Sequence, residues 1–239
     1  MRSHMYEDLA RKEKGYWWHV VRRGNLIDAL RRAGFQGGRV LEVGCGTGAN
    51  LRDLRKLGWS VTGVDLAPEA LAHCRDLPVL RANGLKPLPF KDGAFDAVVM
   101  LDVLEHLEDV APLIAETRRV LRTKGVVMVM VPADPSLWSY WDEMNGHRRR
   151  YTRESLSACF QGWRREGGGF SFSFMAAPVK IYRRLKSRSV RKDDHTDFID
   201  LPSWLNTLLV AAGTLERSLA RILPLPCGTT LSGVWRKTA

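Results

Sequence analysis

Short apolar runs alternate with stretches of helical periodicity along the first half of the chain. The apolar runs that predict strands are residues 39–43, 60–64, 79–80, 94–101 and 125–131. The stretches that predict helices are residues 6–33, 49–57, 68–74 and 110–121. Because strands and helices alternate, we expect a mostly parallel sheet covered by helices on both faces.

The second half of the chain departs from this alternation. Residues 152–160 predict a helix that Thr152 caps, with Ser155 where a capping box usually has Glu. Residues 170–174 alternate Phe and Ser, which predicts a half-buried strand, and residues 230–236 predict the last strand. Between them lie a highly charged stretch, residues 180–198, and apolar positions at helical spacing over residues 203–223. The pattern therefore predicts a helical insertion before the last strand.

Composition narrows the class of protein. The chain has 239 residues, of which 45% are hydrophobic, so it suits a single domain with a sizeable core. It holds no run of 18 apolar residues, and we expect no bilayer-spanning helix. Its four cysteines are scattered and form no C-x-x-C pair, which fits a reducing cytoplasm. The net charge of +11 favours phosphates, anionic lipids or acidic substrates, and a solubilising basic surface explains it equally well.

The clearest motif is the glycine-rich loop Gly44-Cys45-Gly46-Thr47-Gly48, which follows a predicted strand and opens a helix. Glycines let the backbone approach a ligand closely, and the helix N-terminus offers free N–H groups to an anion. The spacing is G-x-G-x-G after an acid, Glu42, and Asp65 ends the next strand, where it can bind ribose hydroxyls. Asp102 ends the fourth strand at the same edge.

With these residues the chain resembles the class I S-adenosylmethionine (SAM)-dependent methyltransferases, densely over residues 40–131. The resemblance implies a Rossmann-like sheet of seven strands and SAM as cofactor. It also implies that the glycine loop holds the methionine part of SAM, Asp65 the ribose, and Leu66 the adenine. Asn83 stands where the family often has Asp. The implied cofactor site comprises Glu42, Gly44, Cys45, Gly46, Gly48, Asp65, Leu66, Asn83, Gly84, Leu101, Asp102 and His106.

The sequence predicts four parts along the chain. We expect residues 1–4 to be a cloning scar, residues 5–37 an N-terminal helical cap, residues 38–175 and 228–239 the SAM-binding core, and residues 176–227 a helical and basic cap over the acceptor. Residues 178–226 could pack their apolar stripe onto the core, lie on a membrane surface, or form a dimer contact. The chain is accordingly expected to be a monomer or a homodimer.

Two histidines are candidates for a general base. His106 follows the fourth strand, His147 follows the fifth, and both belong to segments that end at the substrate edge of the sheet. A purely structural role under the cofactor explains His106 equally well. Asp102 could instead hold the methionine amino group. No ligand spacing in the sequence indicates a metal site.

Two aromatic and basic segments are candidates for binding the acceptor. The first holds Tyr16, Trp17, Trp18 and Arg22 before the sheet, and the second holds Trp138, His147, Arg148 and Tyr151 after strand five. The second resembles the D-x-x-x-x-H-R-R-R-Y segment of a methyltransferase subgroup linked to glycan or lipid-linked sugar synthesis. The alternatives are a structural aromatic core and a loop in which Asp142 pairs with an arginine.

We expect methyl transfer to the oxygen or nitrogen of a small molecule, such as a sugar, a lipid-linked compound or an anionic metabolite. A nucleic-acid methyltransferase is the first alternative, but residues 101–104 lack the Asn/Asp-Pro-Pro-aromatic tetrad of the exocyclic-amine enzymes and the Pro-Cys of the cytosine-C5 enzymes. A nicotinamide oxidoreductase is disfavoured by the glycine spacing. A non-catalytic SAM-binding module remains open.

Overall fold

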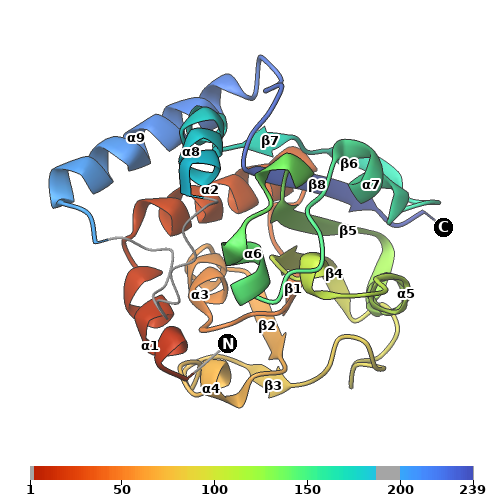
Figure 1. Cartoon of the computed structure of the whole chain (residues 1–239). Coiled ribbons are helices and arrows are strands. Elements are labelled where there is room, and N and C mark those ends of the chain that lie inside the picture. Colours follow the sequence, from red (N-terminus) through yellow and green to blue (C-terminus); the bar gives the residue numbers. More distant parts are fainter. Residues whose placement is uncertain (1–2, 187–199, 239) are drawn as a thin grey trace.

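The computed structural model describes residues 3–186 and 200–238 and contains a central sheet in the order β3-β2-β1-β4-β5-β8-β6, with β7 also paired to β8 (Figure 1). The strands are β1 (Arg39–Val43), β2 (Ser60–Asp65), β3 (Val79–Arg81), β4 (Phe95–Leu101), β5 (Leu121–Pro132), β6 (Arg164–Gly167), β7 (Phe170–Ser171) and β8 (Thr230–Arg236). The pairs among β1 to β5 are parallel, and β8 is antiparallel to its neighbours. The expected mostly parallel α/β sheet is confirmed.

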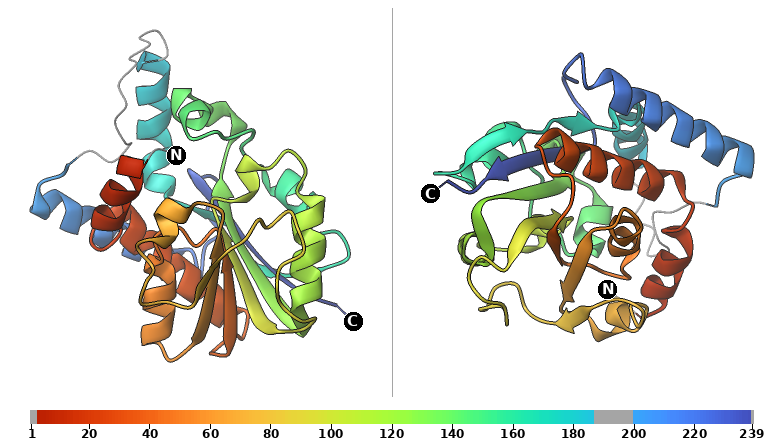
Figure 2. Two further views of the ribbon diagram at one scale, coloured as in Figure 1. Left: turned by 90° about the horizontal axis from the view of Figure 1, so that it is seen from below. Right: turned by 180° about the vertical axis from the view of Figure 1, so that it is seen from behind.

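Helices cover both faces of this sheet (Figure 2). They are α1 (Ser3–Lys12), α2 (Trp17–Arg32), α3 (Ala49–Lys56), α4 (Pro68–Leu71), α5 (Ala111–Val120), α6 (Tyr140–Met144), α7 (Arg153–Ala158), α8 (Ser173–Lys186) and α9 (Ser203–Leu219), with short 3-10 turns η1 (Leu104–His106) and η2 (Pro135–Leu137). Strand β4 is buried on both sides: Val98 packs with α5 and α7, and Val99 packs with α2 and α3. A continuous apolar run is therefore what this strand requires. The box of Thr152 and Ser155 caps α7 as predicted.

The strand predicted over residues 170–174 is wrong beyond Ser171. Phe172 has a left-handed backbone (φ 58°), and α8 begins at Ser173. The cause lies on α9, where the Glu216 carboxylate accepts backbone N–H groups from Phe172 at 2.5 Å and Ser173 at 2.7 Å. An acid at this position satisfies the N–H groups that open a helix and favours the helix over continuation of the strand.

The single helix predicted over residues 6–33 is also wrong, because α1 and α2 are separated at residues 13–16. The Arg23 side chain donates to the Glu13 carbonyl at 2.5 Å and pairs with Asp53 at 2.7 Å, which fixes the break against the core. Ser3 and His4, two of the residues set aside as a cloning scar, belong to α1. The predicted helix over residues 68–74 is shorter, ending at Leu71.

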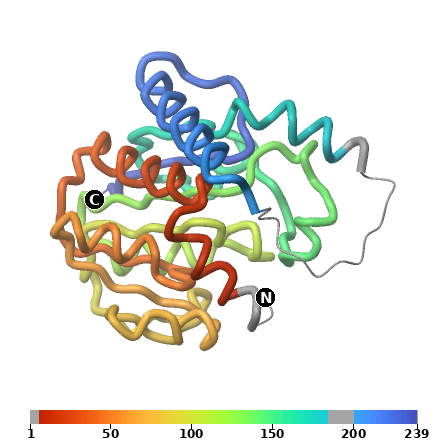
Figure 3. Tube along the Cα trace, turned by 90° about the vertical axis from the view of Figure 1, so that its left-hand side faces the viewer, coloured from red at the N-terminus to blue at the C-terminus, as the bar shows by residue number. Residues whose placement is uncertain are grey.

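Helix α9 lies along α2 (Figure 3). The contact is close at Gly213, where an added Cβ would lie 2.6 Å from Val21 Cγ2. The apolar stripe expected to pack onto the core faces outward instead, because Trp204, Leu208 and Leu215 are 57–68% exposed. The helix packs through its opposite face, which holds Gly213. The prediction that the apolar stripe of this segment packs onto the core is therefore wrong. Part of the charged stretch, residues 187–199, lies outside the described residues.

Candidate active site

A cavity of about 900 Å³ lies at the carboxyl ends of β1, β2 and β4, with α1, α2 and α8 contributing to its walls. It brings together many of the residues that the sequence analysis singled out. These are Gly44, Cys45, Gly46, Asp65, Leu66, Asn83, Gly84, Leu101, Asp102 and His106 from the cofactor set, and Tyr16, Trp17, Trp18, Arg22 and His147 from the acceptor set. The two sets therefore share one space.

The three glycines of the loop have different surroundings although all have a left-handed backbone. An added Cβ on Gly46 would meet nothing within 4 Å, so this residue faces open cavity. On Gly48 it would lie 2.5 Å from Leu77 and 2.8 Å from Cys74, and on Gly44 it would lie 2.6 Å from Val103. Gly48 is not part of the cavity wall and permits close packing at the start of α3 instead.

The Asp65 carboxylate is held in a fixed orientation at the cavity wall. Its Oδ2 accepts the Gly46 N–H at 2.8 Å, and its Oδ1 accepts the Ala67 N–H at 2.9 Å. Each oxygen keeps a further lone pair that can accept a hydroxyl proton. Leu66 beside it is 59% exposed and offers an apolar surface to a flat ring. These residues fit the ribose and adenine of SAM.

Glu42 lies behind the cavity wall. It is 1% exposed, its Oε1 accepts from Asn50 Nδ2 at 2.6 Å, and Asn50 itself lines the cavity. Burial raises the pKa of Glu42 to about 8. Any influence of Glu42 on a ligand therefore passes through Asn50, which the sequence analysis did not single out.

The segment directly after α1 supplies a residue that the sequence analysis did not single out. The Glu13 carboxylate accepts a hydrogen bond from the Thr47 hydroxyl of the glycine loop and lines the cavity. Burial raises the pKa of Glu13. The N-terminal segment therefore contacts the glycine loop and also supplies Tyr16, Trp17 and Trp18 to the cavity wall.

An ion pair joins α2 to the edge of the sheet. Arg22 Nη2 lies 2.5 Å from Asp102 Oδ2, and the Arg22 guanidinium lies 4.8 Å from the ring centre of Trp18. Asp102 has a left-handed backbone (φ 54°) directly after β4. This pair fixes Trp18 next to the end of β4, where cofactor and acceptor residues meet.

The two candidate histidines come together although 41 positions separate them in the sequence. The ring centroids of His106 and His147 are 4.9 Å apart and the rings are nearly perpendicular. His147 Nδ1 lies 3.0 Å from Asp142 Oδ1, and Asp142 also pairs with Arg150 at 2.8 Å and Arg183 at 3.6 Å. Burial and the neighbouring His147 lower the pKa of His106. The predicted pairing of Asp142 with an arginine is present, and it orients His147.

Three expected acceptor residues lie outside the cavity wall. Trp138 is 38% exposed, Arg148 lies 3.7 Å from Glu108 on the surface, and Tyr151 is buried with its hydroxyl donating to the Leu104 carbonyl at 3.0 Å. Other residues take this part of the wall: Trp141, Met144, Asn145, Arg150, Met175, Val179 and Arg183. The aromatic and arginine runs contained Trp141 and Arg150, whereas nothing in the sequence marked the α8 residues.

The sheet order, the antiparallel β8 and the loop facing Asp65 define a Rossmann-like fold with a nucleoside-type cofactor cavity. The chain belongs to the methyltransferase-domain family, whose sequence model matches residues 17–163. This confirms the resemblance to SAM-dependent methyltransferases, and SAM is the cofactor of the family. No helix among the described residues is long and apolar enough to cross a membrane.

Three relatives illustrate the similarity. A protein of Mycobacterium tuberculosis (strain CDC 1551 / Oshkosh), named a probable S-adenosylmethionine-dependent methyltransferase, is 40% identical over 39% of this chain and 35% of its own length. The demethylmenaquinone methyltransferase of Tropheryma whipplei (strain Twist) is 34% identical over 39% of this chain and 41% of its own length. The ubiquinone biosynthesis O-methyltransferase of Xanthomonas oryzae pv. oryzae (strain PXO99A) is 32% identical over 46% and 53%. The matches thus cover about half or less of these relatives.

Solved structures show the same fold at low identity. A SAM-dependent methyltransferase from Archaeoglobus fulgidus superposes with a TM-score of 0.58 and 18% identity, covering 95% of this chain and 97% of that one. The geranyl diphosphate C-methyltransferase of Streptomyces coelicolor A3(2) superposes with a TM-score of 0.58 and 17% identity, covering 91% of this chain and 80% of that one. At this identity the comparison supports the fold alone.

Proposed function

We propose that this chain transfers a methyl group from SAM to an oxygen or nitrogen of a small-molecule acceptor. The observation that carries the proposal is one continuous cavity that joins Gly46 and Asp65 at one end to His106 and His147 at the other. Bound SAM supplies an electrophilic methyl group, and the loop backbone, Asp65 and Leu66 are the residues that would hold it. Because the donor is already reactive, positioning of the acceptor is the main task of the protein.

The acceptor end favours a molecule with an apolar body and an anionic or polar group. Trp18, Trp141 and Met175 line it with apolar surface. Arg150 and Arg183, which pair with Asp142, line it as well. Arginines bind carboxylates and phosphates through two parallel hydrogen bonds. Two relatives bear the names of quinone-pathway methyltransferases, which supports an acceptor of comparable amphiphilic character for this chain.

The His106–His147 pair is the proposed acceptor-activating group. Both rings line the cavity, and Asp142 orients the His147 ring. A hydroxyl acceptor must lose its proton as the new bond forms, so a group that favours the deprotonated oxygen accelerates transfer. An amine acceptor depends less on such help.

Trideuteriomethyl-labelled SAM tests the proposal. The protein is incubated with labelled SAM and separate aqueous and solvent extracts of small molecules, and labelled products are sought by mass spectrometry. We expect a labelled product that is absent with Asp65→Ala, since loss of the ribose-binding carboxylate weakens S-adenosylhomocysteine binding at least about tenfold. Glu108→Ala, at a mostly exposed site, is the matched control. S-adenosylhomocysteine binding without labelling of any extract would favour the non-catalytic SAM-binding module.

We also propose that the outer face of α9 contacts an anionic lipid surface. Trp204, Leu208, Leu215 and Leu219 form an exposed apolar stripe, and Ile222 beyond the helix is 87% exposed. The net charge of +11 favours an anionic surface. An amphipathic helix of this kind can place its apolar face at the headgroup boundary, from which an amphiphilic acceptor could be drawn.

Flotation with phosphatidylglycerol vesicles at low salt tests the lipid contact. We expect co-flotation, lost with Leu208→Ser and retained with Thr207→Ala on the same helix. Absence of co-flotation would overturn it. So would a concentration-dependent dimer in sedimentation that Leu208→Ser abolishes, since the stripe would then face a second copy of the chain.

A further inference from the structure

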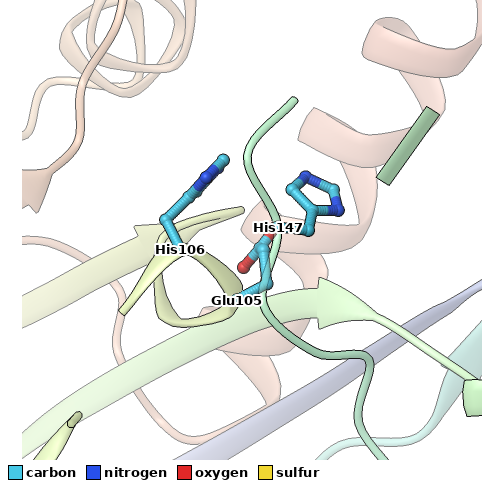
Figure 4. A group of neighbouring side chains, drawn as sticks. All are labelled: Glu105, His106 and His147. Carbon is cyan, nitrogen blue, oxygen red and sulfur yellow. The ribbon is translucent and has the colours of Figure 1, made fainter. Parts of the chain in front are cut away.

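A buried carboxylate lies directly below the two histidines of the cavity. Glu105 and His106 belong to η1, and His147 comes from the segment after α6. Each of the three residues has one side-chain atom that could bind a metal ion, and these three atoms lie within 4.8 Å of one another (Figure 4). The residues converge because η1 closely follows β4 and because the Arg148 backbone N–H donates to the Glu105 carbonyl at 2.7 Å. A sequence pattern could not show this cluster, since its two segments lie far apart in the chain.

The surroundings of the Glu105 carboxylate favour binding of a cation. The residue is 0% exposed, and neither carboxylate oxygen has a hydrogen-bond partner. A buried carboxylate without a partner is costly, and a coordinated metal ion is one of the few ways in which proteins satisfy such a group.

His147 is held by a partner outside the cluster. Asp142 Oδ1 lies 3.0 Å from Nδ1 of His147, which leaves Nε2 as the ring nitrogen available to bind an ion. Histidines that bind metals usually donate their second ring N–H to a carboxylate or a carbonyl, which fixes the ring and its tautomer.

We propose that Glu105, His106 and His147 form a binding site for a divalent first-row transition-metal ion such as Zn²⁺, Mn²⁺ or Fe²⁺. Two imidazoles and one carboxylate suit these ions, whereas Mg²⁺ and Ca²⁺ prefer oxygen ligands alone. His106 and His147 line the cavity, so coordination positions not taken by protein face the acceptor end. An acceptor hydroxyl bound there would have a lowered pKa. The activation of an acceptor hydroxyl rests on the proposed function, whereas the metal site itself does not.

Titration of metal-free protein with Co²⁺, followed by visible absorption and by calorimetry, tests the site without a methyl-transfer assay. We expect one ion per chain with ligand-field bands. Affinity should fall at least about tenfold in His106→Ala, His147→Ala and Glu105→Gln. His73→Ala, which alters a histidine outside the cluster, should bind Co²⁺ as the unaltered chain does. Circular dichroism establishes that each variant is folded, and His147→Ala alone carries the test if Glu105→Gln is not.

Two results would overturn the proposal: no ligand-field bands at millimolar Co²⁺, or bands that persist at full affinity in His147→Ala. Binding of Mg²⁺ in preference to Co²⁺ would contradict the ligand chemistry as well. S-adenosylhomocysteine binding, measured in parallel, separates this inference from the proposed function. Failure of Co²⁺ binding with intact S-adenosylhomocysteine binding removes the metal site alone.

Discussion

Gly46 and Gly48 lie two positions apart, share a left-handed backbone and belong to one motif, yet the structure gives them different neighbours. Gly46 borders open cavity and donates its N–H to Asp65. Gly48 lies against Leu77 and Cys74, away from the cavity. The motif therefore combines ligand approach at one residue with helix packing at another, and the two requirements can be separated by substitution.

We predict that Gly46→Ala and Gly48→Ala fail in different ways. For Gly46→Ala the strained backbone lowers the free energy of unfolding by roughly 1–2 kcal/mol, and the methyl group enters the ligand space, so S-adenosylhomocysteine affinity falls at least about tenfold. Gly48→Ala adds overpacking of roughly 1–3 kcal/mol to the same strain. Folded Gly48→Ala should bind S-adenosylhomocysteine almost normally. Urea unfolding and calorimetry measure both quantities, and equal affinity losses would contradict the assignment.

Residues close together along one motif were predictable, and residues joined across the fold were not. The glycine loop and Asp65 follow from a strand, a turn and the next strand in order. The Arg22–Asp102 pair, the Glu13 contact with Thr47 and the Glu105 cluster each join distant segments. Their partners depend on how the helices dock, which a local pattern does not specify.

At the scale of elements, local periodicity predicted the strands better than the helix termini. The central strands of a parallel sheet are buried on both faces, so β4 and residues 125–131 of β5 were recognisable as continuous apolar runs. Helix ends depend on hydrogen bonds from other elements, as Glu216 shows for α8 and Arg23 for the break before α2. The outward stripe of α9 was visible in sequence, but its direction depended on Gly213 packing against Val21.

The α2–α9 contact predicts opposite effects for two glycine-to-alanine substitutions. Within a helix, Ala is favoured over Gly by about 1 kcal/mol. Gly24→Ala on α2 meets only the flexible end of Arg217, so we expect a stability gain of about 0.5–1 kcal/mol. Gly213→Ala on α9 meets the Cβ and both methyl groups of the buried Val21 within 3.2 Å, so overpacking of roughly 1–3 kcal/mol outweighs the gain. Urea unfolding that finds Gly213→Ala the more stable of the two would contradict this packing.

At the scale of the whole molecule, buried titratable groups give the stability a pH dependence of two signs. His19 is buried beside Arg22 and Arg23, and burial lowers its pKa to about 3. Glu42 is buried below the glycine loop, and burial raises its pKa to about 8. Both groups are therefore neutral in the folded protein at neutral pH, although one is an acid and the other a base.

The stability that His19 contributes is present above its unfolded pKa of about 6.5 and is lost as pH falls toward 3. For Glu42 the contribution is present below about 4.5 and is lost as pH rises through 8. Each pH unit within either window changes the free energy of unfolding by up to about 1.4 kcal/mol. Between pH 4.5 and 6.5 the two effects oppose each other.

Glu42→Gln and His19→Gln separate these contributions, and each variant is the control for the other. Between pH 6.5 and 8, the unaltered chain should lose about 2 kcal/mol relative to Glu42→Gln, because in this range unfolding changes the charge of Glu42 and not that of His19. Between pH 6.5 and 4.5, it should lose about 2–3 kcal/mol relative to His19→Gln. Urea unfolding at pH 4.5, 6.5 and 8 without ligand gives both differences. A Glu42→Gln curve parallel to that of the unaltered chain from pH 6.5 to 8 would mean that Glu42 is ionised in the folded protein, with Asn50 and Arg22 compensating its charge.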